Sequence, residues 1–195
     1  SESPASIDMT WDQYLKVTSG SFSDNLFSNL TKVNLVVSGT ATEISSLFSR
    51  FGSDFSTLQN SLSFKITDGA EVTLNVGQAD KLDGRISGAI NIEDSSTNIA
   101  AMLSGKINEN VKDISTAGGV LEISVDQFRN LPLFNNDAVT INDTELNILK
   151  ALSHNVLDDR VTKLKISHNG EFGTADQTLT LTAAQAGKLG YYTIE

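Results

Sequence analysis

The feature that most constrains this chain is a short phrase that recurs four times. In each copy a Thr, Asn or Ser stands three residues before a Gln: Thr10 and Gln13, Asn75 and Gln78, Ser124 and Gln127, Thr182 and Gln185. This spacing predicts a capping box, in which the first side chain bonds the backbone N–H at N3 and the Gln reaches back to the cap. A short alternating strand precedes the phrase. The Gln phrase, as we call it, therefore predicts repeated strand-to-helix junctions and carries no catalytic chemistry.

A second phrase, the Ile phrase, alternates with the first. An alternating strand is followed by Thr or Ser, then by Glu or Asn three residues later, then by Ile. The copies are Thr40-Glu43-Ile44, Ser95-Asn98-Ile99 and Thr144-Asn147-Ile148. The first is a full capping-box sequence, and the other two predict weaker caps. Both phrases recur with a period of about 50 residues, which indicates internal repeats.

The residues after each Ile phrase have helical spacing. Apolar side chains follow one another in steps of three and four, which places them on one helix face. The three sets predict long helices that run to Leu58, Val111 and Leu157. Further short strands then follow at 62–66, 111–114 and 161–166. Glycine-containing turns at 68–69, 118–119 and 169–170 lead from them into the next strand.

We therefore expect an α/β repeat fold, a solenoid-like stack of about three to four units. One unit would read strand, long helix, strand, turn, strand, short helix, and stacking would supply the core that a single unit lacks. The boundaries are 1–32 for an atypical partial repeat, then 33–87, 88–136 and 137–195, together one continuous domain. The last repeat would end in the first strand of a further unit, because Gly190–Glu195 matches Gly88–Glu93, so we expect an excerpt from a longer array. The alternative is a compact α+β domain of pseudo-symmetric halves.

Charge and composition narrow the classes of function. A net charge of −10 disfavours nucleic acid and anionic membranes as partners. The absence of cysteine excludes disulfides, thiolate metal sites and a cysteine nucleophile. No run reaches the roughly 18 apolar residues that span a bilayer. The first residues lack the pattern of a secretion leader, so we expect any export signal elsewhere.

The two phrases resemble repeats from very large bacterial secreted or surface proteins. The resemblance depends on Asp143–Ile148 and Asp94–Ile99, alternating with Leu179–Ala186, and covers about residues 33–195. Many proteins with such repeats look like type I secretion substrates or adhesins. The resemblance implies a stalk or scaffold outside the cell. The calcium-binding Gly-Gly-x-Gly-x-Asp nonapeptide that often accompanies such proteins does not occur here.

Candidate chemical groups are few. His154 and His168 have no partner at a spacing that suggests a zinc site or an activated nucleophile, so we expect solvent-facing side chains. Oxygen-rich clusters occur at Asp158–Asp159, at 135–137, and at Asp80 and Asp83 around Lys81. Calcium prefers such ligands, but Asn and Asp also favour turns for conformational reasons, and no EF-hand loop is present. We expect no cofactor and no metal, with a structural calcium ion as the alternative.

Aromatic residues gather near the two ends of the sequence. These residues are Trp11, Tyr14, Tyr191 and Tyr192. They could form a sugar-binding platform, but we expect them to pack against neighbouring units. Gly118–Gly119 belongs to no phosphate-binding pattern and predicts a turn. Two sequons, at Asn29 and Asn142, would be idle in a bacterial protein.

Together these features predict a non-enzymatic structural or adhesive segment of a bacterial secreted or cell-surface protein, with no catalytic, cofactor or metal residues. Its partners would be neighbouring repeats of the parent chain and possibly a cell-surface polysaccharide or protein, with no membrane insertion. The alternative is a module that binds carbohydrate or protein through a sheet face. An enzyme is a third possibility, and it would need a pocket with convergent carboxylates or a histidine.

Overall fold

The computed structural model describes residues 5–19, 33–51, 55, 62–134, 138–167, 187 and 193–194. The chain divides into two compact units. Unit 1 comprises Ser1–Ile92 and Asn108–Lys112, and unit 2 comprises Glu93–Ile107 and Asp113–Glu195. The four repeat boundaries drawn from the sequence stay a prediction.

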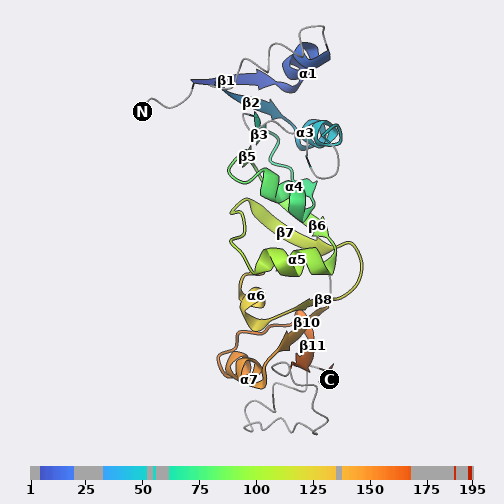
Figure 1. Ribbon diagram of the computed structural model, residues 1–195, viewed down its shortest axis with the longest axis vertical. Coiled ribbons are helices and arrows are strands. Elements are labelled where there is room, and N and C mark those ends of the chain that lie inside the picture. The colour runs from blue at the N-terminus through green and yellow to red at the C-terminus, as the bar shows by residue number, and fades with distance from the viewer. Residues whose placement is uncertain are drawn as a thin grey trace. The chain divides into compact units, whose positions relative to one another are not determined.

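Strands and helices alternate along both units (Figure 1). Unit 1 contains β1 (Ala5–Thr10), α1 (Trp11–Ser19), β2 (Val33–Gly39), α3 (Ala41–Phe48), β3 (Leu62–Ile66), β4 (Val72–Leu74), α4 (Val76–Lys81), β5 (Ile86–Ser87) and the first part of β6 (Ile90–Asp94). Unit 2 contains α5 (Ser96–Leu103), most of β7 (Val111–Thr116), β8 (Leu121–Ile123), α6 (Val125–Arg129), β9 (Leu133–Phe134), β10 (Val139–Asp143), α7 (Glu145–Ser153), β11 (Val161–Ile166) and β12 (Thr193–Ile194).

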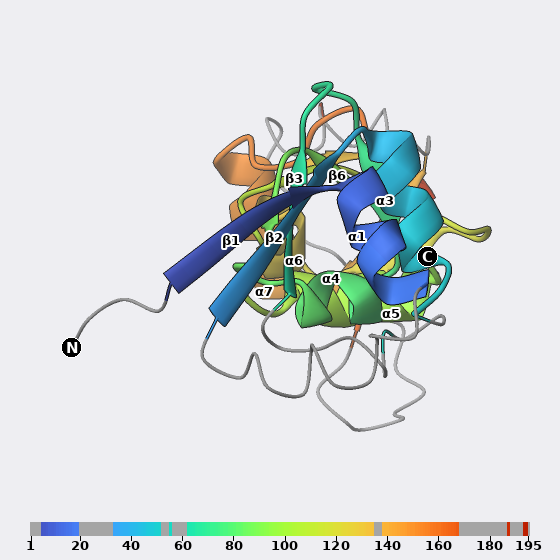
Figure 2. The ribbon, with the colours of Figure 1, turned by 90° about the horizontal axis from the view of Figure 1, so that it is seen from above.

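The strands form three parallel sheets, which confirms the predicted α/β class. Unit 1 holds the sheet β1-β2-β3-β5, in which β1 and β2 lie side by side (Figure 2). Unit 2 holds the sheet β8-β10-β11-β12. The third sheet contains β4 paired with β6 and β7 paired with β9.

The two sheets that lie within single units are built in the same order. In each, the first strand leads into a Gln-phrase helix, α1 after β1 and α6 after β8. The second strand leads into an Ile-phrase helix, α3 after β2 and α7 after β10. The third strand follows that helix, and a two-residue strand closes the sheet. Chain order and strand order therefore correspond between the two units.

Strands β3 and β8 each have one buried and one largely polar face. In β3, Leu62, Phe64 and Ile66 are buried while Lys65 is exposed. In β8, two buried residues flank the exposed Glu122. Because side chains alternate along a strand, the buried residues of β3 and β8 lie on one face of their sheets. The Ile-phrase helices supply that packing, as α3 contacts β2 and β3, and α7 contacts β10 and β11.

The predicted capping boxes are confirmed wherever the structure describes them. At α4 and α6, Asn75 and Ser124 each accept from the N3 backbone while the Gln side chain accepts from the cap N–H. Thr10 and Gln13 exchange the same two bonds, at 2.8 and 3.3 Å. The Ile phrase at Thr40 also forms a full box, whereas Ser95 and Thr144 cap their helices without a reciprocal bond. Thr182 lies outside the described residues.

The predicted lengths of the Ile-phrase helices are wrong. These helices end at Phe48, Leu103 and Ser153, each within about two turns of its cap. Asn155, just past α7, has a left-handed φ of 54°, and Phe55 has the same value. Val111 begins a strand instead of ending a helix. Phe51 and Phe55, beyond the end of α3, contact other aromatic rings and do not extend the helix.

An aromatic cluster in unit 1 shows where such residues go. The ring of Phe48 lies 4.9 Å from that of Phe55 and 4.8 Å from that of Phe64 on β3. Phe51 completes the cluster, 6.2 Å from Phe55. These spacings favour edge-to-face contacts, which add to the stabilisation from burial. Leu58 lies outside the described residues.

Candidate functional site

His154 occupies a structural position. It is the C-cap residue of α7, and its exposed ring places Nδ1 2.8 Å from the backbone oxygen of Lys150. That carbonyl accepts the bond, so Nδ1 carries the proton. A histidine near a helix C-terminus also interacts favourably with the helix dipole when charged. His168 lies outside the described residues.

Asp158 is engaged by its neighbour in a turn before β11. The guanidinium of Arg160 donates to both carboxylate oxygens, the closest contact being 2.7 Å. The hydrogen bond to Arg160 holds the pKa of Asp158 below its usual range, although partial burial opposes the shift. Arg160 also donates to Pro132 O at 2.9 Å and lies 4.8 Å from the ring centroid of Phe128. The pair therefore links the turn before β11 to the segment between α6 and β9.

Asp80 and Asp83, the predicted oxygen ligands around Lys81, belong to unit 1. Asp83 accepts a bond from Asn108 Nδ2 at 3.2 Å, and Asp80 is exposed. The cluster at 135–137 lies outside the described residues. Within residues that the structure places, no group of three or more His, Asp or Glu side chains could hold a metal ion.

The aromatic residues near the start of the chain lie within unit 1. Tyr14 is buried, and that burial raises the pKa of its hydroxyl, while the charge of Arg50 partly offsets the rise. The Arg50 guanidinium lies 5.9 Å from the ring centroid of Trp11, which is half-buried. Tyr191 and Tyr192 lie outside the described residues.

The strongest polar cluster is one that sequence reasoning missed. Glu122 of β8, Asn142 of β10 and Lys165 of β11 meet on the outer face of the unit 2 sheet, and we call them the sheet-face triad. Lys165 Nζ lies 3.0 Å from Glu122 Oε1, and Asn142 Nδ2 donates to the same oxygen. Asn142 and Lys165 are register partners on adjacent strands. Only the strand register reveals this convergence.

The electrostatics of the sheet-face triad follow from these contacts. The hydrogen bond from Lys165, and next that from Asn142, hold the pKa of Glu122 below its usual range, with smaller help from the charge of Lys163. Asn142 Oδ1 is buried and has no hydrogen-bond partner among the residues that the structure describes. The triad thus presents a partly exposed ammonium group and a partly exposed carboxylate that stays ionised at neutral pH. Such groups can hydrogen-bond a ligand, but Glu122 cannot serve as a general acid at neutral pH.

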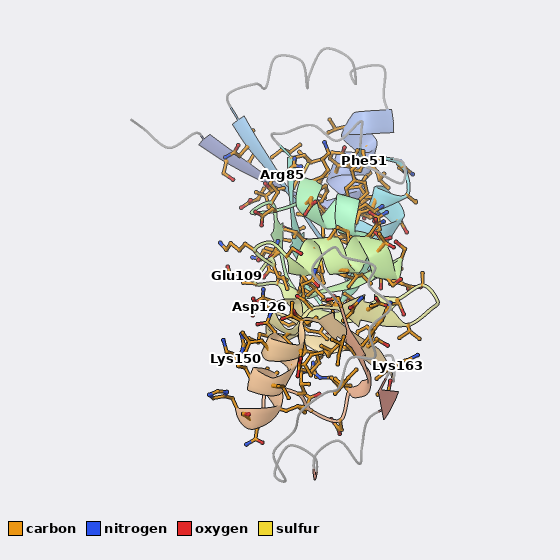
Figure 3. All side chains as sticks on the ribbon, turned by 60° about the horizontal axis from the view of Figure 1, so that its bottom comes forward. Phe51, Arg85, Glu109, Asp126, Lys150 and Lys163 are labelled. Atoms are coloured by element: carbon orange, nitrogen blue, oxygen red, sulfur yellow. The ribbon has the colours of Figure 1, made fainter. Side chains whose placement is uncertain are left out.

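Lys163 of β11 lies on the same sheet face as the triad, because it stands two residues before Lys165, whereas Asp126 and Lys150 belong to helices. Figure 3 shows Lys150 of α7 and Lys163 of β11 projecting in opposite directions. Asp126 of α6 pairs with Arg129 at 2.7 Å, and both side chains are largely exposed. Exposed pairs of this kind contribute little stability.

Side chains also join successive helices within unit 2. Asp143, at the end of β10, accepts from the backbone N–H of Val125 at 2.9 Å, the first residue of α6. Its other oxygen accepts from Thr144 N and from Asn147 Nδ2 at the start of α7. In unit 1, Asp68 similarly accepts from Ala41 N at the start of α3. Carboxylates are favourable at helix N-termini because they complement the helix dipole.

Comparison with known proteins adds no assignment. No protein-family model, no characterised protein and no solved structure matches the chain. No helix in the described part of the chain is long and apolar enough to cross a membrane.

Proposed function

We propose that this chain is a structural or adhesive repeat segment of a bacterial secreted or cell-surface protein, and that its units stack as a solenoid. One observation carries the proposal. In both units the parallel sheet has the same element order, and strands β3 and β8 bury one face and carry mostly polar residues on the other. Parallel sheets in α/β domains are normally covered on both faces. A one-sided parallel sheet is typical of solenoids, in which each unit contacts mainly its neighbours.

The hydrogen bonds between helices support the same proposal. Gln127 of α6 and its C-cap residue Asn130 donate to backbone oxygens in α5, and Asp143 connects α6 with α7. These contacts join consecutive elements of the chain, which is how a quasi-linear stack holds together. The neighbouring repeats of a longer parent chain are the partners that this arrangement favours.

Deletion of one period tests the repeat architecture. Removal of residues 88–136 would connect Ser87 to a segment whose phrases match those removed. We expect the shortened chain to keep the same circular dichroism per residue and to unfold cooperatively. Removal of residues 88–112, about half a period, serves as the control and should prevent folding. If both deletions unfold the chain, the solenoid proposal fails.

Surface labelling tests the proposed location. An antibody raised against the chain should label intact cells of the organism that encodes it, and external protease should remove the signal. A cytoplasmic protein probed in the same cells is the control. A signal that needs permeabilised cells would contradict a role outside the cell.

A binding module for polysaccharide or protein is the second candidate, and the sheet-face triad favours it. Glu122 and Lys165 are both nearly half exposed on this face, so their charged groups are accessible to a ligand. Glycan-array binding that is lost in Glu122→Gln and kept in Lys150→Ala, a variant on α7, would support this function. Binding that is absent, or equal in both variants, would contradict it.

A further inference from the structure

The first strand of each sheet carries two inward-facing residues. These residues are buried in β4 and β8 but not in β1. In β4 these positions are Val72 and Leu74, at 0% and 2% exposure. In β8 they are Leu121 and Ile123, at 0% and 2%. Both pairs stand directly before the cap of a Gln-phrase helix. These positions are therefore core positions wherever they occur inside the chain.

The corresponding residues of β1 are Ile7 and Met9, which precede the Thr10 cap. They pair in register with Leu35 and Val37 of β2, which are 4% and 0% exposed. Register partners on parallel strands point to the same face, so Ile7 and Met9 face the core side of the sheet. Ile7 is nevertheless 44% exposed, and Met9 is only partly covered. Figure 2 shows β1 extending beside β2.

A helix accounts for the difference at the other two strands. In unit 1 the Ile-phrase helix α3 packs against β4, and in unit 2 the Ile-phrase helix α5 packs against β8. Each helix precedes the strand that it covers. Each presents buried apolar residues near its middle and end, such as Ile44 and Leu47 in α3, and Ile99 and Leu103 in α5. A helix of the same kind would fit over β1.

We propose that Ile7 and Met9 form a docking surface for an Ile-phrase helix of a neighbouring repeat of this type. The inference rests on the proposed repeat function. The occupant is an amphipathic helix that starts at a Ser or Thr cap and carries aliphatic or aromatic residues four and eight positions later. This is the pattern of Ser95, Ile99 and Leu103. An exposed aliphatic pair on the packing face of a sheet gains most from an apolar partner of this shape.

The test titrates the full chain with a synthetic peptide of residues 93–106, which contains the α5 sequence. The methyl signals of Ile7 and Met9 are followed by NMR. We expect these two signals to shift, and we expect no shift with a control peptide that carries Ile99→Asp and Leu103→Asp. In the chain, Ile7→Asp should weaken binding by about tenfold or more, whereas Asp8→Asn, on the opposite face of β1, should leave the affinity unchanged.

Three results would overturn the inference. The first is an absence of shifts at Ile7 and Met9 up to millimolar peptide. The second is protection of both methyls from a soluble paramagnetic agent in the dilute chain alone, since another part of the chain would then cover them. The third is shifts that depend on chain concentration and not on peptide, which would identify a second copy as the occupant. Failure here leaves the one-period deletion test intact, so the two proposals can fail separately.

Discussion

The side-chain nitrogen of Gln127 lies 2.7 Å from the backbone oxygen of Ala100, so one residue serves two helices. Its Oε1 accepts from the N–H of Ser124 and closes the capping box of α6. Its Nε2 donates to Ala100 O, and also to Ser104 Oγ at 2.8 Å, at the C-terminal end of α5. The N-terminus of one helix is thereby tied to the C-terminus of the helix before it.

Gln127→Glu separates the two roles of this side chain. A carboxylate can still accept from the cap N–H, but it cannot donate to Ala100 O, and it places negative charge at the C-terminal end of α5. We expect the free energy of unfolding to fall by about 1–3 kcal/mol, measured by urea denaturation at pH 7. Gln78→Glu is the control, because Glu43 already performs the capping role at α3, and it should change stability little. Equal losses in both variants would contradict the second role.

Asp143 provides a prediction about the junction between α6 and α7. It accepts bonds from Val125 N, Thr144 N and Asn147 Nδ2. Asp143→Asn keeps the shape of the side chain but turns an amide group toward one of these donors. We expect a loss of about 1–3 kcal/mol in thermal or urea unfolding.

The control for Asp143 is Asp126→Asn. Asp126 pairs with Arg129, but 82% of its side chain is exposed. Its removal should cost no more than about 0.5 kcal/mol. A loss at Asp126 that equals the loss at Asp143 would mean that general charge, and not the junction, sets the stability.

The pH dependence of stability should include a contribution from Glu122. Bonds from Lys165 and Asn142 lower the pKa of Glu122 in the folded state below its unfolded value of about 4.3. A lowered folded pKa gives stability that is fully present above the unfolded pKa and is lost as the pH falls through the folded pKa. The contribution is small, because nearly half of both side chains is exposed.

Glu122→Gln should therefore reduce the loss of stability between pH 5 and about pH 3. The unfolding midpoint in urea, measured across this range, gives the comparison. High salt should also shrink the difference between the two proteins, because it screens the Lys165 charge. An unchanged slope in the variant would show that the triad does not form in solution.

The sequence could predict where helices begin better than where they end. Capping boxes depend on residues three positions apart, so Asn75 with Gln78 and Ser124 with Gln127 are visible without any tertiary information. The ends of the Ile-phrase helices depend on the chain turning toward the next strand. Asn155, with its left-handed φ, was a readable stop signal, because Asn often occupies the residue after a helix. Beyond Asn155, the helical spacing of the apolar residues no longer corresponds to a helix.

Residues that meet across strands could not be predicted in the same way. Glu122 and Lys165 come from β8 and β11, and their approach depends on the register of both strands with β10. The second hydrogen bond of Gln127 likewise requires that α5 and α6 be placed side by side. The outward alternation of each strand was visible in the sequence, but which outward residues become neighbours was not.

Gly88 gives a prediction about the turn that leads into β6. Its φ is 131°, in the region that favours glycine, and a Cβ built there would lie 2.6 Å from Ile66 Cβ. Gly88→Ala therefore adds both backbone strain and a clash with a buried side chain. Gly118 has a φ of 113° but open space around its Cβ position, so Gly118→Ala adds the strain alone.

We expect Gly88→Ala to destabilise the chain by about 2–4 kcal/mol and Gly118→Ala by about 1 kcal/mol in urea unfolding. Equal effects of the two glycine substitutions would show that β3 and the turn at Gly88 do not approach as closely as described.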